Sequence, residues 1–332
     1  MNAPSLAFVV PCYNEEEVLE ALLGRLHPIS QALVDAGAIG GPARIVLVDD
    51  GSSDRTWEMI EAASQDSAGQ VQGIKLSRNH GHQAALLAGL MTAQEDVLIS
   101  LDADLQDDPD AIPKMVEAHG RGADIVFGVR SRRDTDTAFK RWSAQSYYSV
   151  LQGMGIDIIP DHADYRLMSR RAVEALRGFD EANLFLRGII KSLGFQTEVV
   201  TYARSERFAG ESKYPVSKML KLAVEGITSF STRPLRYVTF MGIGVALIAM
   251  MLALYSLVQW SEGTTVSGWT SIMMVILFLG AFQLIALGII GEYLGKVFIE
   301  SKKRPRFLID KIVGGDGAEA PGSEALGRTR AS

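Results

Sequence analysis

The sequence predicts an α/β protein, in which a mostly parallel β-sheet has helices on both faces and is followed by two membrane-spanning helices. Two observations support this prediction. Short apolar segments alternate with helix-forming segments as far as Tyr202, which is typical of parallel strands joined by right-handed crossovers. Farther along, Tyr237–Trp260 and Ser267–Gly291 contain no charged residue, and each is long enough to cross a hydrocarbon layer of about 30 Å.

The strands are predicted from short apolar runs that end in polar, glycine or proline residues. In chain order they are Leu6–Val10, Ala43–Val48, Val71–Leu76, Val97–Leu101, Ile125–Val129 and Phe195–Tyr202. Phe195–Tyr202 is expected to be the final strand. Because helices separate the first five strands, the carboxyl ends of these strands are expected at one edge of the sheet.

The helices are predicted from capping residues and apolar periodicity. Asn14 with Glu17 resembles a capping box, so the first helix is expected to run over Glu15–Leu26. Ser53 or Asp54 is expected to cap the second helix. The other helices are expected at Gln83–Ala93, after Asp108-Pro109, at Phe139–Gly153 and at Arg170–Leu176.

Polar side chains follow several strands at the expected sheet edge. They are Tyr13, Asp49, Asp50, Arg78, Asp102, Asp104 and Arg130. Open α/β sheets bind ligands at the carboxyl ends of their strands, so these side chains are expected to share one crevice although they are far apart in the chain. The alternative for Asp49 and Asp50 is that they only cap a turn.

The segment Asp102-Ala103-Asp104-Leu105-Gln106 lies where the fourth strand must leave the sheet. Its carboxylate and amide oxygens are hard ligands for Mg²⁺ or Mn²⁺, ions that commonly take further ligands from water and substrate phosphates. Considered alone, the segment is also compatible with a solvated acidic turn before the helix at Asp108-Pro109. A second strand that ends in acidic residues, Asp49 and Asp50, is expected nearby and favours the metal site.

Composition and motifs argue against several classes of protein. The net charge of -6 disfavours a nucleic-acid partner, because phosphate backbones are bound by basic surfaces. The single cysteine, Cys12, excludes an intramolecular disulfide, and no signal peptide is expected. The chain has no Gly-x-x-x-x-Gly-Lys-Ser/Thr loop and no Gly-x-Gly-x-x-Gly after the first strand, which disfavours P-loop enzymes and ordinary dinucleotide-binding proteins.

Charged residues around the two apolar segments predict their orientation. Arg233 and Arg236 precede the first segment, whereas the loop between the segments has no Lys or Arg. The basic residues near the end of the second segment are Lys296, Lys302, Lys303, Arg304 and Arg306. The positive-inside rule therefore places both ends in the cytoplasm. The inner membrane of the cell is the expected location. Small residues at Gly242–Gly244 could support helix contacts and a homo-oligomer.

These patterns divide the chain into four parts. An α/β domain is expected at residues 1–215, an amphipathic helix at 216–232, a membrane hairpin at 233–300, and a basic and then disordered tail at 301–332. The amphipathic helix could lie on an anionic bilayer surface or pack on the domain core. The basic, glycine-containing loop Arg204–Tyr214 could close over an anion or serve as a linker.

Four motifs carry a family resemblance. They are Pro11-Cys12-Tyr13-Asn14-Glu15, Val48-Asp49-Asp50-Gly51-Ser52, Asp102-Ala103-Asp104-Leu105-Gln106 and Asp164-Tyr165-Arg166. Together they resemble the family 2 glycosyltransferases of the GT-A fold. With the two apolar segments, the chain resembles in particular the polyprenyl-phosphate glycosyltransferases, such as dolichyl-phosphate mannose synthase and the bactoprenol glucosyltransferases.

The resemblance implies roles for individual residues. Pro11, Tyr13, Glu15 and Asp49 would hold the base and ribose of a nucleotide sugar, Asp102 would lie near its phosphates, and Asp104 and Gln106 would coordinate the metal. Asp164 matches an acid that acts as base or orients the acceptor, and with Asp102 it forms the expected catalytic pair. The residues expected to bind the acceptor or its phosphate are Arg130, Arg141, Arg207, Ser212 and Lys213. From chemistry alone, Asp50 could bind the ribose or base, and Arg78 a phosphate.

The implied reaction transfers a sugar with inversion from a nucleotide sugar, UDP-glucose being the first expectation, to a polyprenyl (undecaprenyl) phosphate. The acceptor phosphate is already anionic near neutral pH, so Asp164 could position it instead of deprotonating it.

Three other functions fit parts of the pattern. A processive polysaccharide synthase would show Gln-x-x-Arg-Trp after the acceptor motif, but here Arg141-Trp142 precedes that motif, and two spans are few for an extrusion channel. A haloacid-dehalogenase-like phosphatase also uses Asp-x-Asp after a strand, but needs Thr or Val at the position of Gln106. A non-enzymatic membrane scaffold would leave the acidic residues without a role.

Overall fold

The computed structural model describes residues 3–67, 69–130, 162–181, 186–202, 233–261 and 268–315. The chain forms two compact units. Of the described residues, the first unit contains those between 3 and 202 and those from 303 to 315, and the second contains those between 233 and 302. The helices predicted at Phe139–Gly153 and at residues 216–232 lie outside the described residues.

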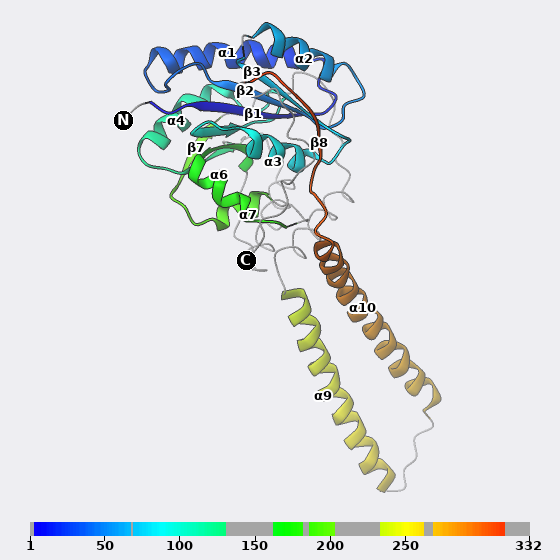
Figure 1. Ribbon diagram of the computed structural model, residues 1–332. Coiled ribbons are helices and arrows are strands. Elements are labelled where there is room, and N and C mark those ends of the chain that lie inside the picture. The colour runs from blue at the N-terminus through cyan, green and yellow to red at the C-terminus, as the bar shows by residue number, and fades with distance from the viewer. Residues whose placement is uncertain are drawn as a thin grey trace, which may run out of the picture. The chain divides into compact units, whose positions relative to one another are not determined.

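Within the described ranges, eight strands form one sheet in the order β7-β5-β6-β4-β1-β2-β3-β8 (Figure 1). The strands are β1 (Leu6–Cys12), β2 (Arg44–Asp49), β3 (Val71–Leu76), β4 (Val97–Ser100), β5 (Ile125–Arg130), β6 (His162–Ser169), β7 (Thr197–Tyr202) and β8 (Ile309–Val313). The helices are α1 (Leu19–Asp35), α2 (Thr56–Asp66), α3 (His82–Thr92), the 3-10 turn η1 (Pro109–Ala111), α4 (Ile112–Gly120), α6 (Arg170–Arg177), α7 (Leu186–Ser192), α9 (Arg233–Ser261) and α10 (Trp269–Ser301).

The sheet is mostly parallel, as the sequence predicts. β1 pairs in parallel with β2 and β4, β2 with β3, and β5 with β7. β6 is antiparallel to both β4 and β5, and β8 is antiparallel to β3. The pairing of Ser100 with Arg166 places the first residues of β6 beside the carboxyl end of β4. These residues therefore reach the same edge as the loops that follow the parallel strands.

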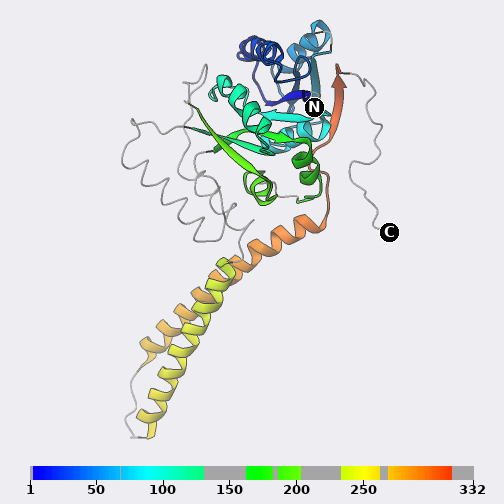
Figure 2. The same ribbon diagram turned by 90° about the vertical axis from the view of Figure 1, so that its left-hand side faces the viewer.

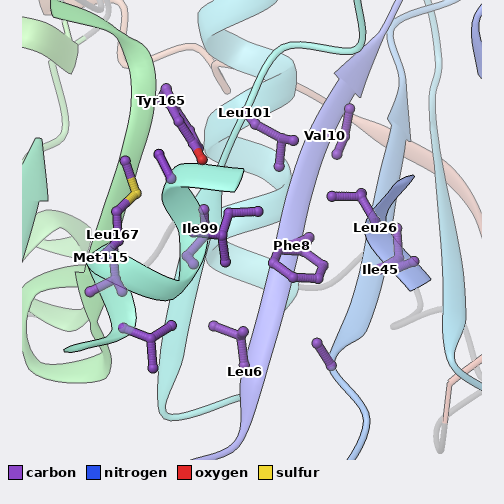
Figure 3. Packing of buried hydrophobic residues seen from close by; sticks show 14 of the residues in the cluster. Leu6, Phe8, Val10, Leu26, Ile45, Ile99, Leu101, Met115, Tyr165 and Leu167 are labelled. Atoms are coloured by element: carbon purple, nitrogen blue, oxygen red, sulfur yellow. The ribbon is translucent and has the colours of Figure 1, made fainter. Parts of the chain in front are cut away.

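One face of the sheet is covered by α1 and α4. Leu6, Phe8 and Val10 of β1 belong to a buried apolar cluster that also contains Leu26 of α1 and Met115 of α4 (Figure 3). Alternate residues of a strand point to the same face, so one face of β1 packs within this cluster. Burial of these side chains holds the two helices on the sheet.

The other face is covered by α3. A Cβ atom at Gly89 would lie 2.4 Å from Val9 Cγ1 and 2.9 Å from Val48 Cγ2. Because a side chain there would push α3 away from the strands, the glycine permits their close packing. The expected arrangement with helices on both faces is confirmed, and α3 is fixed with its first residue, His82, near the carboxyl edge.

The first helix begins later than predicted. α1 begins at Leu19 and not at Glu15, and Val18 at its N-cap makes no side-chain capping bond. The side chain of Asn14 instead accepts a hydrogen bond from Ser53 N at 2.9 Å. The predicted capping box was therefore wrong, because Asn14 joins two loops of the sheet edge.

A strand that the sequence analysis did not predict follows α10. β8 pairs with β3 from Gly73 opposite Val313 to Leu76 opposite Ile309. The expectation that Phe195–Tyr202 forms the final strand was therefore wrong. Part of the tail at residues 301–332 is an edge strand of the sheet. Its five residues do not alternate strongly between apolar and polar side chains, so the sequence did not indicate a strand there.

The second unit contains α9 and α10, which run alongside each other (Figure 2). Of the helices in the described ranges, these two are long and apolar enough to cross a membrane, at Leu235–Leu252 and Phe278–Ser301. Large apolar side chains such as Phe240 and Leu284 are exposed on them. A long helix with apolar side chains on all sides is typical of a membrane span. Both helices overlap the spans expected from the sequence.

Candidate active site

The carboxyl edge of the sheet brings together most of the predicted site residues. They are Tyr13 and Glu15 after β1, Asp49 at the end of β2 and Asp50 after it, Arg78 after β3, Asp102, Asp104 and Gln106 after β4, Arg130 at the end of β5, and Asp164 in β6. Pro11 is buried within β1, opposite Val48 of β2. The predicted acceptor residues Arg141, Arg207, Ser212 and Lys213 lie outside the described residues.

Hydrogen bonds join the loops that follow β1 and β2. Four of them are Asn14 N to Ser52 Oγ at 3.0 Å, Ser53 N to Asn14 Oδ1 at 2.9 Å, Glu15 N to Thr56 Oγ1 at 2.8 Å, and Glu16 N to Asp54 Oδ2 at 3.2 Å. Asp54 Oδ1 also accepts a hydrogen bond from Thr56 N at 3.0 Å, in the first turn of α2. These bonds hold the exposed ring of Tyr13 beside the end of β2.

Asp49 is completely buried at the end of β2. Its Oδ1 accepts a hydrogen bond from Ser52 N at 3.2 Å, whereas its Oδ2 has no hydrogen-bond partner within the described ranges. A buried carboxylate oxygen without a donor is costly, and a hydroxyl or N–H group of a ligand would relieve that cost. This geometry suits the predicted contact to a ribose or base.

Asp50 has a different environment. Its Oδ1 accepts a hydrogen bond from His80 N at 2.7 Å, and its Oδ2 accepts one from Gly81 N at 2.9 Å. Burial raises the pKa of Asp50, although these two N–H groups act in the opposite direction. Asp50 therefore fixes the loop after β3, which carries the exposed Arg78 at the site edge.

The motif after β4 forms a compact acidic turn. Gln106 Nε2 donates a hydrogen bond to Asp104 Oδ2 at 2.7 Å, and Gln106 N donates to Asp104 Oδ1 at 3.1 Å. Burial raises the pKa of Asp102 to about 6; His82 opposes this shift, and the neighbouring acidic residues increase it. Asp102 Oδ1 is also buried without a hydrogen-bond partner in this part of the chain.

The acidic turn fits a divalent cation only if other ligands complete the shell. In the described residues, no group of three or more His, Cys, Asp or Glu side chains is placed to hold a metal ion. Mg²⁺ in phosphate-binding enzymes often uses one or two carboxylates, with water and phosphate oxygens as further ligands. Asp102 and Asp104 supply such oxygens, and a cation would offset the cost of the buried Oδ1 atom of Asp102, whose side chain is 31% exposed. The residues present therefore fit a cation bound together with a phosphate ligand.

Asp164 is almost completely buried and is surrounded by three basic side chains. Its Oδ1 accepts a hydrogen bond from Arg166 Nη2 and lies 3.4 Å from Arg187 Nε. Its Oδ2 lies 3.3 Å from Arg187 Nη2 and 3.4 Å from His82 Nε2. Burial alone would raise the pKa of Asp164, but the three basic groups hold this pKa well below its usual value. Asp164 is therefore ionised at neutral pH.

The sequence analysis did not identify His82 and Arg187 as site residues. His82 Nε2 lies 3.4 Å from Asp102 Oδ1 as well as from Asp164 Oδ2, so the imidazole joins the two expected catalytic carboxylates. Burial alone would lower the pKa of His82, but these carboxylates raise it. One sequence signal was available, because His82 follows the turn after β3. Arg187 had no comparable signal, because it lies on α7 and not at the end of a strand.

Asp107, also missed, joins the ends of three strands. Its Oδ1 accepts hydrogen bonds from Arg130 Nε at 3.0 Å, from Arg130 Nη2 at 2.8 Å and from Tyr202 Oη at 2.6 Å. The Asp107 side chain is buried, whereas that of Arg130 is 29% exposed. Arg130, predicted to meet a phosphate, is therefore held at the site edge by an acidic partner.

The acidic residues at the ends of these strands agree with the match of this chain to a protein-family model. Residues 7–177 match the family model described as Glycosyl transferase family 2. The chain belongs to glycosyltransferase family 2. The match contains all four motifs of the site, from the loop after β1 to the Asp164 segment of β6.

Members of this family resemble the chain along nearly its whole length. It is 46% identical over 311 residues to the uncharacterized glycosyltransferase YkoT of Bacillus subtilis (strain 168), covering 93% of this chain and 92% of the relative. It is 40% identical over 306 residues to the bactoprenol glucosyl transferase of Shigella phage SfV, with coverage of 92% and 97%. A prophage bactoprenol glucosyl transferase homolog of Escherichia coli (strain K12) is 38% identical over 309 residues, with coverage of 92% and 99%.

Solved structures resemble part of the chain. Glucosyl-3-phosphoglycerate synthase from Mycobacterium tuberculosis, in complex with Mn²⁺, uridine diphosphate and phosphoglyceric acid, has a TM-score of 0.45 and 18% identity, covering 68% of this chain and 76% of its own. Mannosyl-3-phosphoglycerate synthase from Rubrobacter xylanophilus has a TM-score of 0.48 and 16% identity, with coverage of 70% and 74%.

Proposed function

We propose that this glycosyltransferase moves a sugar from a nucleotide-sugar donor, with UDP-glucose as the first candidate, to the phosphate of a polyprenyl phosphate. The observation that carries the proposal is the meeting of Asp49, the Asp102–Gln106 motif and Asp164 at one sheet edge. The names of relatives that align along nearly the whole chain, bactoprenol glucosyl transferases, support the lipid acceptor.

The donor half of the site would bind the nucleotide through the loops after β1 and β2. The exposed Tyr13 ring offers a surface for the base, and the unpaired Oδ2 of Asp49 offers an acceptor for a hydroxyl or N–H group. Asp104 and Gln106 would hold Mg²⁺ or Mn²⁺, which, when bound, would neutralise the diphosphate leaving group. A cation held there would also offset the negative charge of Asp102, so that the phosphates of the donor could lie near that carboxylate.

The acceptor half would lie toward β5 and β6. In the proposed step, a phosphate oxygen of the lipid attacks the anomeric carbon as the bond to the nucleoside diphosphate breaks, which inverts the configuration. Arg130, held by Asp107, supplies positive charge for the acceptor phosphate. Because the attacking oxygen is already anionic, the reaction requires no strong base, and the ionised Asp164 acts by orientation.

The membrane assignment rests on the two apolar helices. A polyprenyl phosphate is confined to the bilayer by its chain, so an enzyme that uses it must work at a membrane surface. The absence of Lys and Arg between the apolar segments supports a hairpin with both ends in the cytoplasm of the cell, across the inner membrane.

A transfer assay with product analysis tests the proposal. Membranes containing the chain are incubated with undecaprenyl phosphate and a panel of labelled nucleotide sugars, and the extracted lipid is analysed by mass spectrometry. We expect one sugar to be added to the lipid phosphate in Mg²⁺ or Mn²⁺ and little transfer after chelation with EDTA. A polymer would identify a processive synthase, and the absence of nucleotide-sugar binding would favour a scaffold.

The metal assignment has a separate test within the same assay. Asp104→Asn is expected to reduce transfer by about a hundredfold or more, because a cation ligand becomes a neutral amide. Asp110→Asn is the matched control, since Asp110 is an exposed acid in η1 whose partner, Arg25, is also exposed. Wild-type transfer by Asp104→Asn would show that the metal assignment is wrong.

A further inference from the structure

The carboxylate of Asp102 needs a partner that its own loop does not supply. Its Oδ1 atom is buried and accepts no hydrogen bond within the described ranges. Burial raises the pKa of Asp102, and the negative charges of Asp164, Asp107 and Asp104 raise it further. Because the neighbouring side chains of the acidic turn repel this carboxylate, its orientation depends on a donor from another element.

The imidazole of His82 lies where such a donor is needed. Its Nε2 atom is 3.4 Å from Asp102 Oδ1 and 3.4 Å from Asp164 Oδ2. Both neighbours are carboxylate oxygens, which accept hydrogen bonds, so the Nε2 atom carries a proton. The usual N–H···O distance is about 2.7–3.2 Å, so a small movement completes a bond to either oxygen. Of the basic groups in the described ranges, His82 has the largest effect on the pKa of Asp102, which it lowers.

Asp164 depends less on His82 than Asp102 does. Its Oδ1 accepts a hydrogen bond from Arg166 Nη2, and its Oδ2 lies 3.3 Å from Arg187 Nη2. Two arginine side chains therefore hold Asp164 without the imidazole. The contribution of His82 is expected mainly at Asp102.

The backbone on both sides of His82 is fixed. Gly81 N donates a hydrogen bond to Asp50 Oδ2 at 2.9 Å, and Gln83 Oε1 accepts one from Leu186 N at 3.0 Å. His82 itself is the first residue of α3, the helix that packs on β1. The imidazole is therefore carried by a rigid part of the fold, which is what the orientation of a second side chain requires.

We propose that His82 is a positioning residue that orients the carboxylate of Asp102 toward the phosphates of the donor and their cation. The inference rests on the proposed function, in which Asp102 lies near those phosphates. An N–H group at Oδ1 fixes the direction of the whole carboxylate, so the other oxygen is held in place as well. His82 acts through Asp102 and touches neither reactant.

Two uncharged variants that differ in reach test this role. The side-chain nitrogen of Gln lies about as far from the backbone as Nε2 of His, whereas that of Asn is closer to the backbone. His82→Gln therefore keeps a donor near the Nε2 position and His82→Asn loses it, although both remove the charge that an imidazole can carry. We expect His82→Asn to bind uridine diphosphate with Mn²⁺ about 10–100-fold more weakly than the wild type, which is the usual loss when a residue that orients a metal-site carboxylate is removed. His82→Gln should recover most of this affinity.

These measurements use the full chain in detergent. Titration calorimetry measures binding of uridine diphosphate, and electron paramagnetic resonance measures unbound Mn²⁺. Farnesyl phosphate, which represents the acceptor, should bind to both variants as to the wild type, because Arg166 and Arg187 still hold Asp164. His27→Asn, in the middle of α1, is the control for loss of an imidazole and should bind both probes normally. Equal nucleotide affinity of folded His82→Gln and His82→Asn, or equal weakening of both probes in His82→Asn, would overturn the proposal.

A measurement without ligand separates this inference from the proposed function. Urea unfolding of the wild type, His82→Asn, Asp102→Asn and the double variant forms a double-mutant cycle. If His82 holds Asp102, each substitution should shift the unfolding midpoint less when the other is already present. Additive shifts would contradict the inference even in a chain that transfers sugar to undecaprenyl phosphate. Non-additive shifts in a chain that neither binds uridine diphosphate nor transfers sugar would support the contact and contradict the proposed function.

Discussion

Asp107 and Arg130 form an ion pair in which one carboxylate oxygen accepts both guanidinium hydrogen bonds, at 3.0 Å from Nε and 2.8 Å from Nη2. The same oxygen accepts a hydrogen bond from Tyr202 at 2.6 Å. Asp107 follows the acidic turn after β4, Arg130 ends β5 and Tyr202 ends β7. One buried acid therefore connects the proposed metal motif to the ends of two neighbouring strands.

Replacement of Asp107 by Asn is expected to lower both stability and transfer. The substitution keeps the shape of the side chain but removes the charge that holds Arg130, so the free energy of unfolding should fall by about 1–3 kcal/mol. Urea unfolding in detergent, followed by circular dichroism, measures this change. Asp110→Asn is the control, because its exposed ion pair with Arg25 should contribute less than about 1 kcal/mol. An unchanged unfolding midpoint for Asp107→Asn would contradict the assigned role.

Asp50→Ala is expected to loosen the loop after β3. The change removes the acceptors of His80 N and Gly81 N and leaves two backbone donors unpaired, at a cost of about 1–3 kcal/mol. Because this loop carries Arg78, the affinity for uridine diphosphate with Mn²⁺ should fall as well. Calorimetry and urea unfolding measure the two effects. Asp66→Ala, at an exposed position of α2, should change neither quantity measurably.

The sheet and part of the site could be predicted because their signals are local. Each parallel strand is an apolar run of the right length, and the rule for open α/β sheets places residues such as Asp49 and Asp102 at one edge. The motif resemblance brought Asp164 into the same site before its strand was known. β6 was not predicted as a strand, because its sequence is dominated by polar and charged residues that become buried only between β4 and β5.

The site residues that were not predicted depend on contacts between distant segments. Arg187 reaches Asp164 because α7 packs beside α3, and no spacing in the sequence reports that packing. Asp107 was adjacent to a recognised motif, yet its role appears only when Arg130 arrives from the next strand. Asn14 illustrates the opposite error: a local capping pattern was present, but a contact to Ser53 used the side chain. Tertiary contacts therefore decided the roles that local patterns did not specify.

Gly51 is expected to tolerate no side chain, for two separable reasons. Its φ is +71°, and a Cβ atom would lie 2.7 Å from Arg78 C and from Asn79 N. Gly37 has a φ of +66° with open space around it, and Gly41 has open space without such a φ. Gly37→Ala should therefore cost about 1–2 kcal/mol of backbone strain, and Gly51→Ala should cost more because it also moves the loop after β3. Gly41→Ala should change stability little.

Comparison of these three alanine variants by urea unfolding separates strain from contact. Gly51→Ala alone should also weaken binding of uridine diphosphate with Mn²⁺, since the displaced backbone belongs to the loop that carries Arg78. Equal destabilisation by Gly51→Ala and Gly37→Ala, with normal nucleotide binding in both, would show that the contact of Gly51 with the loop after β3 affects neither stability nor binding.

Removal of β8 is expected to affect the site through the loop after β3. Ser77 N donates a hydrogen bond to Leu308 O at 2.9 Å, directly before Arg78, and β8 covers the edge of β3. A chain that ends at Arg306 loses this bond and exposes an edge strand, which promotes association through unpaired backbone groups. Its free energy of unfolding should fall by more than the roughly 1 kcal/mol of a typical point substitution, and it should bind uridine diphosphate more weakly. Size-exclusion chromatography, urea unfolding and calorimetry measure the three effects.

Lys311→Ala is the control, because it removes only the exposed contact to Glu61, and it should resemble the wild type. Wild-type behaviour of the truncated chain would contradict a role for β8 in the site.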